Sequence, residues 1–440
     1  MDLPASLTLD QLRTEVTNER IDTVLLALTD MQGRLQGKRI VAQHFLDSVV
    51  EHGSEACNYL LAVDVDMNTV GGYEMSSWER GYGDFELVPD LSTLRVVPWH
   101  EKTALCLADL RWGSEEPVVA SPRQVLRAQL DRLAERGLQA FAATELEFII
   151  FKDTYEEAFE KGYRELKPAN QYNVDYSLVG TARVEKLIGR IRREMTKAGL
   201  VVENSKGECN DGQHEINFKY GPALQTADQH VIYKTGAKEI AALEGQSITF
   251  MAKFNEREGS SCHIHLSVKG LDDTGFERFV AGQLACLREL TLFYAPNINS
   301  YKRFASASFA PTAVAWGHDN RTCAVRIVGH GDSKRLELRV PGADVNPYLA
   351  LAAMIAAGLH GLDHELELEE PVAGNAYASD KPRVPTTLSD ATELFAVSRV
   401  AREAFGEEVV AHYRNNAQVE LDAFNAFVTD WERVRGFERL

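Results

Sequence analysis

The sequence has little cysteine and no long apolar run. Six of its 440 residues are cysteine, and no two of them are spaced as C-x-x-C. Such sparse cysteine is typical of a reducing compartment, so we expect free thiols and a cytoplasmic location. The longest apolar stretch, at 348–359, is shorter than the ~20 residues that cross a bilayer. The first residues carry neither a basic region nor an apolar core, so we expect no signal peptide and no membrane contact.

Basic charge is also scarce. The chain has 47 lysines and arginines against 65 aspartates and glutamates, which gives a net charge of −18. Nucleic-acid-binding proteins normally carry a basic field, so we expect no nucleic-acid partner. No G-x-x-x-x-G-K-[ST] stretch occurs, which excludes a P-loop nucleotide site. The acidic surplus either serves solubility or attracts cations such as metal ions and amines.

Changes of periodicity along the chain predict an α+β protein with two domains. Strands cluster centrally, and helices flank them. A stretch rich in glycine, serine and proline at 113–122 predicts a boundary, so we expect domains at 1–112 and 113–440. The predicted helices cover 6–16, 122–136, 182–198, 227–244, 277–294, 347–362, 389–405 and 418–434. The predicted strands cover 24–28, 59–65, 94–97, 105–108, 140–151, 201–204, 214–220, 248–254, 262–268, 323–328 and 335–340.

Two glutamates share one face of an apolar strand. Residues 144–151 read T-E-L-E-F-I-I-F. Because residues i and i+2 of a strand point the same way, Glu145 and Glu147 lie on one face. Two like charges in a buried strand are unfavourable unless a cation lies between them. The alternative is an exposed edge strand with solvated acids, but the apolar run favours the buried strand.

Charged side chains converge at three further places. These are Glu208 and Glu215 on either side of an Asn-Asp-Gly turn, His263 and His265 on one strand face, and Glu337 between Arg335 and Arg339. A lone histidine pair is more often structural, but the neighbouring carboxylates favour a ligand role here. Carboxylates with one or two histidines and no cysteine favour Mg²⁺ or Mn²⁺ over Zn²⁺.

Arginines are concentrated in the same part of the chain. They are Arg303, Arg321, Arg326, Arg335 and Arg339. Their forked donors suit phosphate and carboxylate oxygens. Two divalent ions that lie close together can hold a phosphoryl group during transfer. The residues therefore predict metal-assisted phosphoryl transfer that involves an anionic substrate.

The order of short motifs resembles the glutamine synthetase family in its bacterial type I form. The resemblance covers nearly the whole chain. Each motif alone is weak, but together and in order they leave little room for chance. The motifs are D-M-Q-G-R at 30–34, P-D-L-S-T at 89–93, E-L-E-F at 145–148, G-Q-H-E at 212–215, H-I-H-L-S at 263–267, N-S-Y-K-R at 299–303, W-G-H-D-N-R at 316–321 and N-P-Y-L at 346–349.

The resemblance implies two metal sites, a nucleotide site and a glutamate site. It implies one metal ion bound by Glu147, Glu208 and Glu215, and a second bound by Glu145, His263 and Glu337. It implies nucleotide phosphate contacts from His265, Arg326 and Arg335, with Glu203 and Ser267 near the nucleoside. It implies that Arg303 and Arg339, beside Gly259, bind the glutamate carboxylates, and that Arg321 steadies the transferring phosphate.

The resemblance also implies a fold and an assembly. The fold is a small N-terminal β-grasp domain and a larger catalytic domain with a curved antiparallel sheet flanked by helices. The assembly is a homo-oligomer, a dodecamer of two stacked hexameric rings, with active sites between subunits. In such a ring Asp66 and Asp84 contribute to the ammonium pocket of the adjacent subunit.

The implied reaction has two steps. ATP phosphorylates the γ-carboxylate of L-glutamate, and an amine then displaces phosphate to leave an amide. Activation is needed because a carboxylate does not expel oxide, whereas an acyl phosphate expels phosphate. Metal ions and arginines stabilise charge on the moving phosphoryl group.

The chain departs from the family where the amine binds. Glutamine synthetases carry a glutamate on a loop after N-S-Y-K-R, and it helps take a proton from ammonium. Here no acidic residue occurs at 304–318, and Phe309 stands at the expected place. Ammonium needs an anionic cage, whereas an aromatic ring packs an alkyl chain or faces a cationic amine. Glu258 replaces the family's asparagine, and it either binds the far end of a larger amine or reflects drift in a loop.

These departures predict a ligase for an organic primary amine. Candidates are polyamines such as putrescine or spermidine, and small amines such as ethanolamine. One alternative is an ordinary glutamine synthetase that uses ammonium and relies on Asp66 and Asp84. Another is a silent assembly or regulatory protein, which the retention of all six metal-ligand positions disfavours. Tyr377 matches a regulatory nucleotidylation position of the family, but its divergent neighbours favour a plain surface loop.

Overall fold

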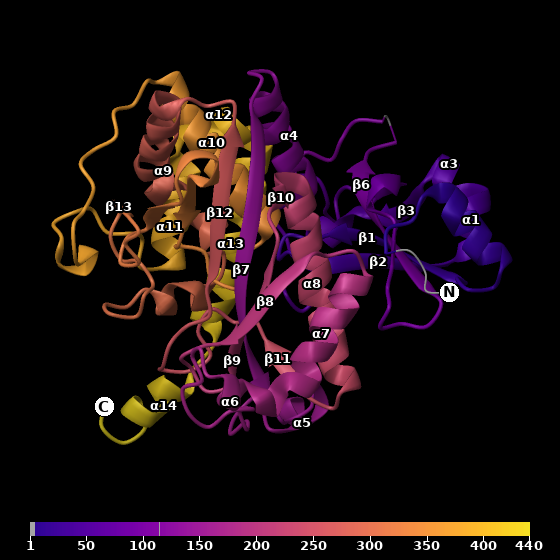
Figure 1. Ribbon diagram of the computed structural model, residues 1–440, viewed down its shortest axis with the longest axis horizontal. Helices are drawn as coiled ribbons and strands as arrows, with labels where there is room; N and C mark the ends of the chain where they lie inside the picture. Colours follow the sequence, from indigo (N-terminus) through magenta and orange to yellow (C-terminus); the bar gives the residue numbers. More distant parts are fainter. Residues whose placement is uncertain (1–4, 114) are drawn as a thin grey trace.

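Two β-sheets with packed helices make up the chain (Figure 1). The computed structural model describes residues 5–113 and 115–440, so residues 1–4 and Ser114, in the predicted linker, lie outside the described residues. One sheet is built from residues between 23 and 111, and the other from residues between 139 and 338. The predicted α+β class is confirmed.

The N-terminal sheet has six strands in the order β2-β1-β6-β4-β3, with β5 beside β6. β1 and β2 form an antiparallel hairpin, and β1 runs parallel to β6. Apolar residues between 7 and 118 form a hydrophobic core against this sheet, and α1 (Leu9–Thr17) contributes Leu12 to it. The strands are β1 Thr23–Thr29, β2 Leu35–Val41, β3 Ser54–Cys57, β4 Asp84–Pro89, β5 Arg95–Val96 and β6 Thr103–Arg111.

The larger sheet has nine strands, and β7 lies at its centre. The order is β13-β14-β15-β12-β7-β9-β8, and β10 and β11 also pair with β7. Its neighbours are antiparallel, as expected, except for the parallel pair β13 and β14. The strands are β7 Gln139–Phe151, β8 Val202–Gly207, β9 Gln213–Phe218, β10 Gly221–Pro222, β11 Ser247–Thr249, β12 Cys262–Lys269, β13 Trp316–His318, β14 Val325–Val328 and β15 Arg335–Leu338.

Helices cover the larger sheet and connect it to the N-terminal sheet. In Figure 1, α4 and α8 lie between β7 and the N-terminal sheet, and both contact β7. α10 is buried along nearly its whole length and packs against α9. It begins at Pro347 because the side chain of Asn346 accepts a hydrogen bond from the Tyr348 backbone N–H. In the part of the chain that the structure describes, no helix has the length and apolar character needed to cross a membrane.

The remaining bounds are as follows. The N-terminal region also contains α2 Ala42–His44 and α3 Val50–His52. The central region contains α4 Pro122–Ala134, α5 Tyr155–Glu160, α6 Leu178–Thr181, α7 Glu185–Lys197, α8 Ala223–Leu243 and α9 Asp273–Tyr294. The C-terminal region contains α10 Pro347–Asp363, α11 Leu388–Val397, α12 Arg399–Phe405, α13 Glu407–Ala426 and α14 Asp430–Gly436.

Three of the predicted elements were wrong. The strand predicted at 59–65 is a 3₁₀ turn, Asn58–Leu61, followed by a loop, because tertiary context overrides the β-propensity of its apolar residues. The helix predicted at 389–405 breaks at Ser398, whose hydroxyl accepts from the Ala401 backbone N–H and so begins α12. The helix predicted at 418–434 is two helices, and the first begins directly after Gly406, which has a φ of 83°.

A buried ionic network connects the two sheets through α4. Arg123 donates to Asp90 at 2.7 Å and to Asp228 at 2.9 Å, and it also pairs with Asp109. The Tyr348 hydroxyl donates to Asp228 at 2.7 Å. Asp90 and Asp109 belong to the N-terminal sheet region, whereas Asp228 lies on α8. Arg123 therefore neutralises acids from both parts of the chain.

Replacing Arg123 by methionine is expected to destabilise the protein by about 3–5 kcal/mol, because it removes the cation that pairs with buried Asp228. The measurement is the denaturation midpoint of the purified protein. The matched control is Arg127→Met on the same helix, whose guanidinium pairs with Asp90 and Asp109 but is 32% exposed. Its expected cost is about 1 kcal/mol. Equal shifts for the two variants would contradict the buried network.

Candidate active site

Three carboxylates meet on one face of the larger sheet. We name Glu147, Glu208 and Glu215 the three-carboxylate cluster, and one oxygen of each lies within 4.8 Å of the others. Glu147 on β7 and Glu215 on β9 are direct cross-strand partners, so the sheet register places them together. Glu208 directly follows β8, and its backbone N–H donates to the Gln213 carbonyl at 2.9 Å.

Burial and mutual repulsion disfavour the charged forms of these carboxylates. Burial, with the charges of Glu208 and Glu215, holds the pKa of Glu147 well above its ordinary value. Burial and neighbouring acids raise the pKa of Glu215 to about 8, and burial raises the pKa of Glu208. Three carboxylates with converging oxygens form a set of hard ligands that suits a divalent cation.

A second cluster of side chains that could bind a metal ion lies on the same face of the sheet. We name Glu145, His263 and Glu337 the histidine cluster, and their ligand atoms also lie within 4.8 Å of one another. Glu145 and His263 are cross-strand partners on β7 and β12. His263 Nδ1 lies 3.4 Å from Glu145 Oε2 and 3.6 Å from Glu337 Oε1. Nitrogen and carboxylate donors thus converge on one point.

The electrostatics of the histidine cluster favour metal-binding protonation states. Burial and the charge of Arg339 lower the pKa of His263 to about 4, so its imidazole is neutral near pH 7. Burial by itself raises the pKa of Glu145, but hydrogen bonds from His263 and His265 outweigh it and hold the pKa well below its ordinary value. A neutral imidazole and an ionised carboxylate are the forms that bind a metal ion.

Arginines surround Glu337, although not in the predicted arrangement. Arg339 Nη1 donates to Glu337 Oε1 at 2.6 Å, as the strand pattern indicated. The second guanidinium beside Glu337 is that of Arg326, whose Nη1 donates to Glu337 Oε2 at 2.9 Å. The two residues meet because β14 places Arg326 directly opposite Glu337 on β15. The prediction that Arg335 flanks Glu337 was wrong, since Arg335 Nε donates to His265 Nδ1 at 3.2 Å.

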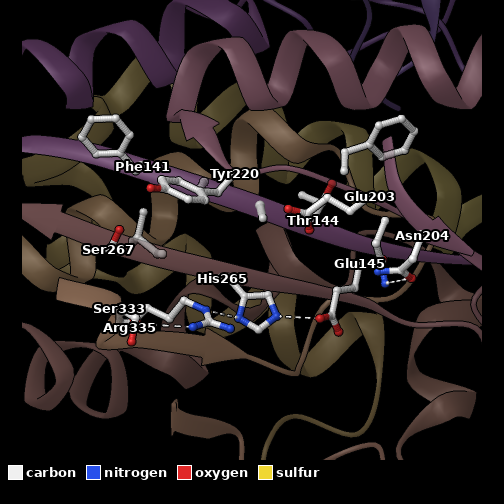
Figure 2. A pocket seen from close by; sticks show the side chains of 15 residues that line it. Phe141, Thr144, Glu145, Glu203, Asn204, Tyr220, His265, Ser267, Ser333 and Arg335 are labelled. Atoms are coloured by element: carbon white, nitrogen blue, oxygen red, sulfur yellow. Dashed lines mark hydrogen bonds and ion pairs between the residues drawn. The ribbon is translucent and has the colours of Figure 1, made fainter. Parts of the chain in front are cut away.

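A cavity of about 580 Å³ opens beside His265. We name it the aromatic cavity, because Phe141, Phe218 and Tyr220 line one part of it. Figure 2 shows His265 between Arg335 and Glu145, with Ser267 and the aromatic rings of Phe141 and Tyr220 on the same side of the sheet. The predicted nucleotide-binding residues that line this cavity are Glu203, His265, Ser267 and Arg335.

The aromatic lining was not predicted. The strand period contains the signal for Phe141, because this residue shares a face with Glu145 on β7. Tyr220 lies beyond the end of β9, where no pattern indicated a site. Ring faces at such positions suit the flat base of a nucleotide.

A second cavity, of about 510 Å³, contains both clusters. We name it the acidic cavity. It shares Glu145, Asn204 and Asn217 with the aromatic cavity, so the two cavities are adjacent. Of the predicted residues outside the clusters, those on its wall are Gly259, Arg321, Arg326 and Arg339. Arg321 is exposed there and forms no salt bridge with any described residue.

Arg303 lies behind this wall rather than on it. Its guanidinium is fully buried and donates to the backbone carbonyls of Arg339 and Val340, both at 2.7 Å. Gly259 packs directly against it, since a Cβ at Gly259 would lie 2.5 Å from Arg303 Cγ. In this conformation Arg303 supports the wall that carries Arg339.

Asp66 and Asp84 are exposed and line neither cavity of their own chain. The loop with Phe309 does reach the acidic cavity. Phe309 is 60% exposed and has a φ of 59°, which is unfavourable for a bulky side chain. Its carbonyl accepts from Arg339 Nη2 at 3.4 Å, and the Tyr377 hydroxyl donates to the Ala310 carbonyl at 2.9 Å. Tyr377 thus holds this loop, rather than lying free on the surface.

Comparison with known proteins identifies the family. Residues 119–435 match the family model described as glutamine synthetase, catalytic domain. The chain belongs to the glutamine synthetase family. A γ-glutamylethanolamide synthetase of Streptomyces coelicolor is 62% identical over 100% of this chain and 97% of its own. A glutamate–isopropylamine ligase of a Pseudomonas species is 38% identical, with 97% of each chain covered.

A solved structure agrees with this chain in fold. The structure of GmaS in complex with ADP matches with a TM-score of 0.84 and 25% sequence identity, over 97% of this chain and 99% of the other. The predicted family, the glutamine synthetase fold of α+β class and the enzyme class, an ATP-dependent carbon–nitrogen ligase, are confirmed. The names of the two relatives agree with the predicted ligation of glutamate to an amine.

The residues present fit the nucleotide and metal ions that glutamine synthetases use. The two clusters supply carboxylate oxygens and one neutral imidazole at converging points, and Glu147 and Glu215 form no salt bridge with any described residue. The aromatic cavity combines ring faces with the hydroxyl of Ser267 and the guanidinium of Arg335. Arg326 lies on the wall of the acidic cavity and Arg335 on that of the aromatic cavity, and their forked donors suit phosphate oxygens.

Proposed function

We propose that the enzyme joins the γ-carboxylate of L-glutamate to a small primary monoamine, such as ethanolamine, with ATP as the phosphoryl donor. The observation that carries the proposal is Phe309, an aromatic side chain on the wall of the acidic cavity where the family's ammonium-binding glutamate is expected. The names of the relatives that are 62% and 38% identical, an ethanolamide synthetase and an isopropylamine ligase, support an amine with an uncharged tail.

The charges of the acidic cavity favour a monoamine over a polyamine. Outside the two clusters, the carboxylates on its wall are Asp175 and Glu258. Asp175 lies 3.3 Å from Lys206 Nζ, and Glu258 lies 3.7 Å from Arg257 Nε. Because each already has a cationic neighbour, the described wall of this cavity offers a second ammonium group only acids that a lysine or arginine partly neutralises. This pairing supports ethanolamine over putrescine or spermidine.

We infer that the two clusters each hold a divalent ion, Mg²⁺ or Mn²⁺. The donor set of hard oxygens and one imidazole supports these ions. When bound, such ions neutralise charge on the phosphate oxygens and so lower the barrier to phosphoryl transfer. His265, Arg326 and Arg335 would hold the phosphates, and Glu203 and Ser267 would lie near the nucleoside.

The remaining arginines have separate proposed roles. Arg339 lies on the cavity wall beside Glu337 and would bind a carboxylate of glutamate, with Arg303 and Gly259 shaping the wall behind it. Arg321 forms no salt bridge with any described residue, so its guanidinium is available to the transferring phosphate. The amine then attacks the γ-glutamyl phosphate and displaces phosphate.

We further propose a dodecamer of two stacked hexameric rings, in which Asp66 and Asp84 of one subunit complete the amine site of the next. Their exposure, and the fact that they line neither cavity of their own chain, support this. So do the exposed apolar side chains of Phe427, Trp431 and Phe437 around α14, which projects from the edge of the chain in Figure 1.

The separate core of the N-terminal sheet supports domains at 1–112 and 113–440, the first a β-grasp. Six cysteines without disulfides support a cytoplasmic location.

An amine panel tests the proposed acceptor. We expect purified enzyme with ATP, Mg²⁺ and L-glutamate to release phosphate faster with ethanolamine or isopropylamine than with ammonium or putrescine. The reason is the apolar wall at Phe309 and the paired state of Asp175 and Glu258. Product masses verify that each amine is incorporated. Faster release with ammonium than with every organic amine would contradict the proposal.

A further inference from the structure

A lysine lies in the same cross-strand row as the three-carboxylate cluster. Lys206 on β8 is the register partner of Glu215 on β9, and Glu215 is the partner of Glu147 on β7. Directly opposed residues of neighbouring strands project from the same face. Two acids and a lysine therefore form one row across the sheet. No sequence motif indicated a role for Lys206.

The ammonium group of Lys206 bridges Glu208 and a second acid. Its Nζ hydrogen-bonds Glu208 Oε1 and lies 3.3 Å from Asp175 Oδ1. The Tyr176 ring centroid lies 4.6 Å away, a cation–π distance. Among the described residues, Lys206 makes the one salt bridge that any member of the three-carboxylate cluster forms.

The ammonium group of Lys206 thus has two anionic partners at slightly different positions, Glu208 and Asp175. The side chain is 23% exposed, so water weakens its attraction to the acids only in part. A divalent ion at the cluster would repel the ammonium group and attract Glu208. Asp175 and the Tyr176 ring then remain as partners for Lys206, so its charge is never left unpaired.

We propose that Lys206 is a positioning residue, an internal counter-cation that holds Glu208 at the cluster and competes with the divalent ion for it. When the ion binds, Lys206 releases Glu208 and pairs with Asp175. The inference rests on the proposed metal site. Because Lys206 competes for Glu208, the three-carboxylate cluster binds its ion more weakly than three carboxylates without a lysine would.

Mn²⁺ titration of the full-length enzyme, followed by the electron paramagnetic resonance signal of free Mn²⁺, tests this. We expect Lys206→Gln to bind one of its two Mn²⁺ ions about tenfold more tightly, because a repelling charge is lost. The metal-free variant should melt at a lower temperature than wild type, since the cluster loses its counter-cation. Lys206→Arg, which keeps the charge, should restore the Mn²⁺ affinity to within about threefold of wild type.

Two further variants separate this role from net charge and from misfolding. Lys219→Gln removes the same charge at an exposed position just beyond β9 and should leave both Mn²⁺ affinities unchanged. Asp175→Asn should weaken Mn²⁺ binding, because Lys206 loses its second acceptor. Unchanged or weaker binding in Lys206→Gln, or tighter binding in Asp175→Asn, would overturn the inference. A wild-type enzyme that binds no Mn²⁺ would overturn the metal site itself.

Discussion

Replacing Glu147 by glutamine is expected to lower amine-dependent phosphate release from ATP by about a thousandfold. The variant removes one of the charges that hold the ion at the three-carboxylate cluster. The amide oxygen still accepts from the Ser261 backbone N–H, which donates to Glu147 at 2.8 Å in the wild type. The fold should therefore survive while the metal site is lost. The measurement is initial-rate phosphate release with saturating ethanolamine and Mg²⁺.

A second readout separates this effect from misfolding. Because burial and neighbouring acids raise the pKa of Glu147, its ionised form opposes folding in the absence of metal. The glutamine variant should thus melt no lower than wild type in the presence of EDTA. The matched control is Glu160→Gln at the exposed end of α5, which should retain full activity. Wild-type activity in Glu147→Gln would contradict the role of the cluster.

Replacing Phe309 by glutamate is expected to raise the preference for ammonium over ethanolamine by at least about tenfold in kcat/KM. A carboxylate on this wall attracts a small cation, and the loss of the ring removes the surface that packs an alkyl chain. The backbone position should be kept, because Arg339 donates to the Phe309 backbone carbonyl, which the substitution does not remove. The measurement is the pair of kcat/KM values for the two amines.

The control for this variant is Phe309→Leu, which keeps an apolar side chain without the ring. It should retain the preference for ethanolamine, although its KM for the amine should rise. KM for ATP should stay unchanged in both variants, since Phe309 lines the acidic cavity and not the aromatic cavity. If the ratio of kcat/KM for ammonium to kcat/KM for ethanolamine is the same in wild type and Phe309→Glu, this loop does not select the amine.

The strand period predicted much of the site. It placed Glu145 and Glu147 on one face of β7, and the structure agrees. It did not show that they serve different clusters. Same-face neighbours on a strand are about 7 Å apart, so each meets a different partner. Glu145 lies opposite His263 on β12, and Glu147 lies opposite Glu215 on β9. The assignment of residues to two ions came from the family resemblance.

Features set by long-range contacts could not be read from local patterns. Arg326 is next to Glu337 only because β14 pairs with β15 in one particular register. Asp175 and Tyr176 lie in a loop with no periodicity, yet they form part of the acidic cavity. The guanidinium of Arg303 satisfies backbone carbonyls behind the wall, which no sequence motif reveals.

The proposal that each cluster binds a divalent ion is tested most directly by anomalous scattering from crystals of the enzyme soaked in Mn²⁺. We expect two strong peaks for each chain, one among Glu147, Glu208 and Glu215 and the other among Glu145, His263 and Glu337. Glu147→Gln should lose the first peak and keep the second. Crystals with no peak, or with peaks only at places outside the two clusters, would contradict the two metal sites.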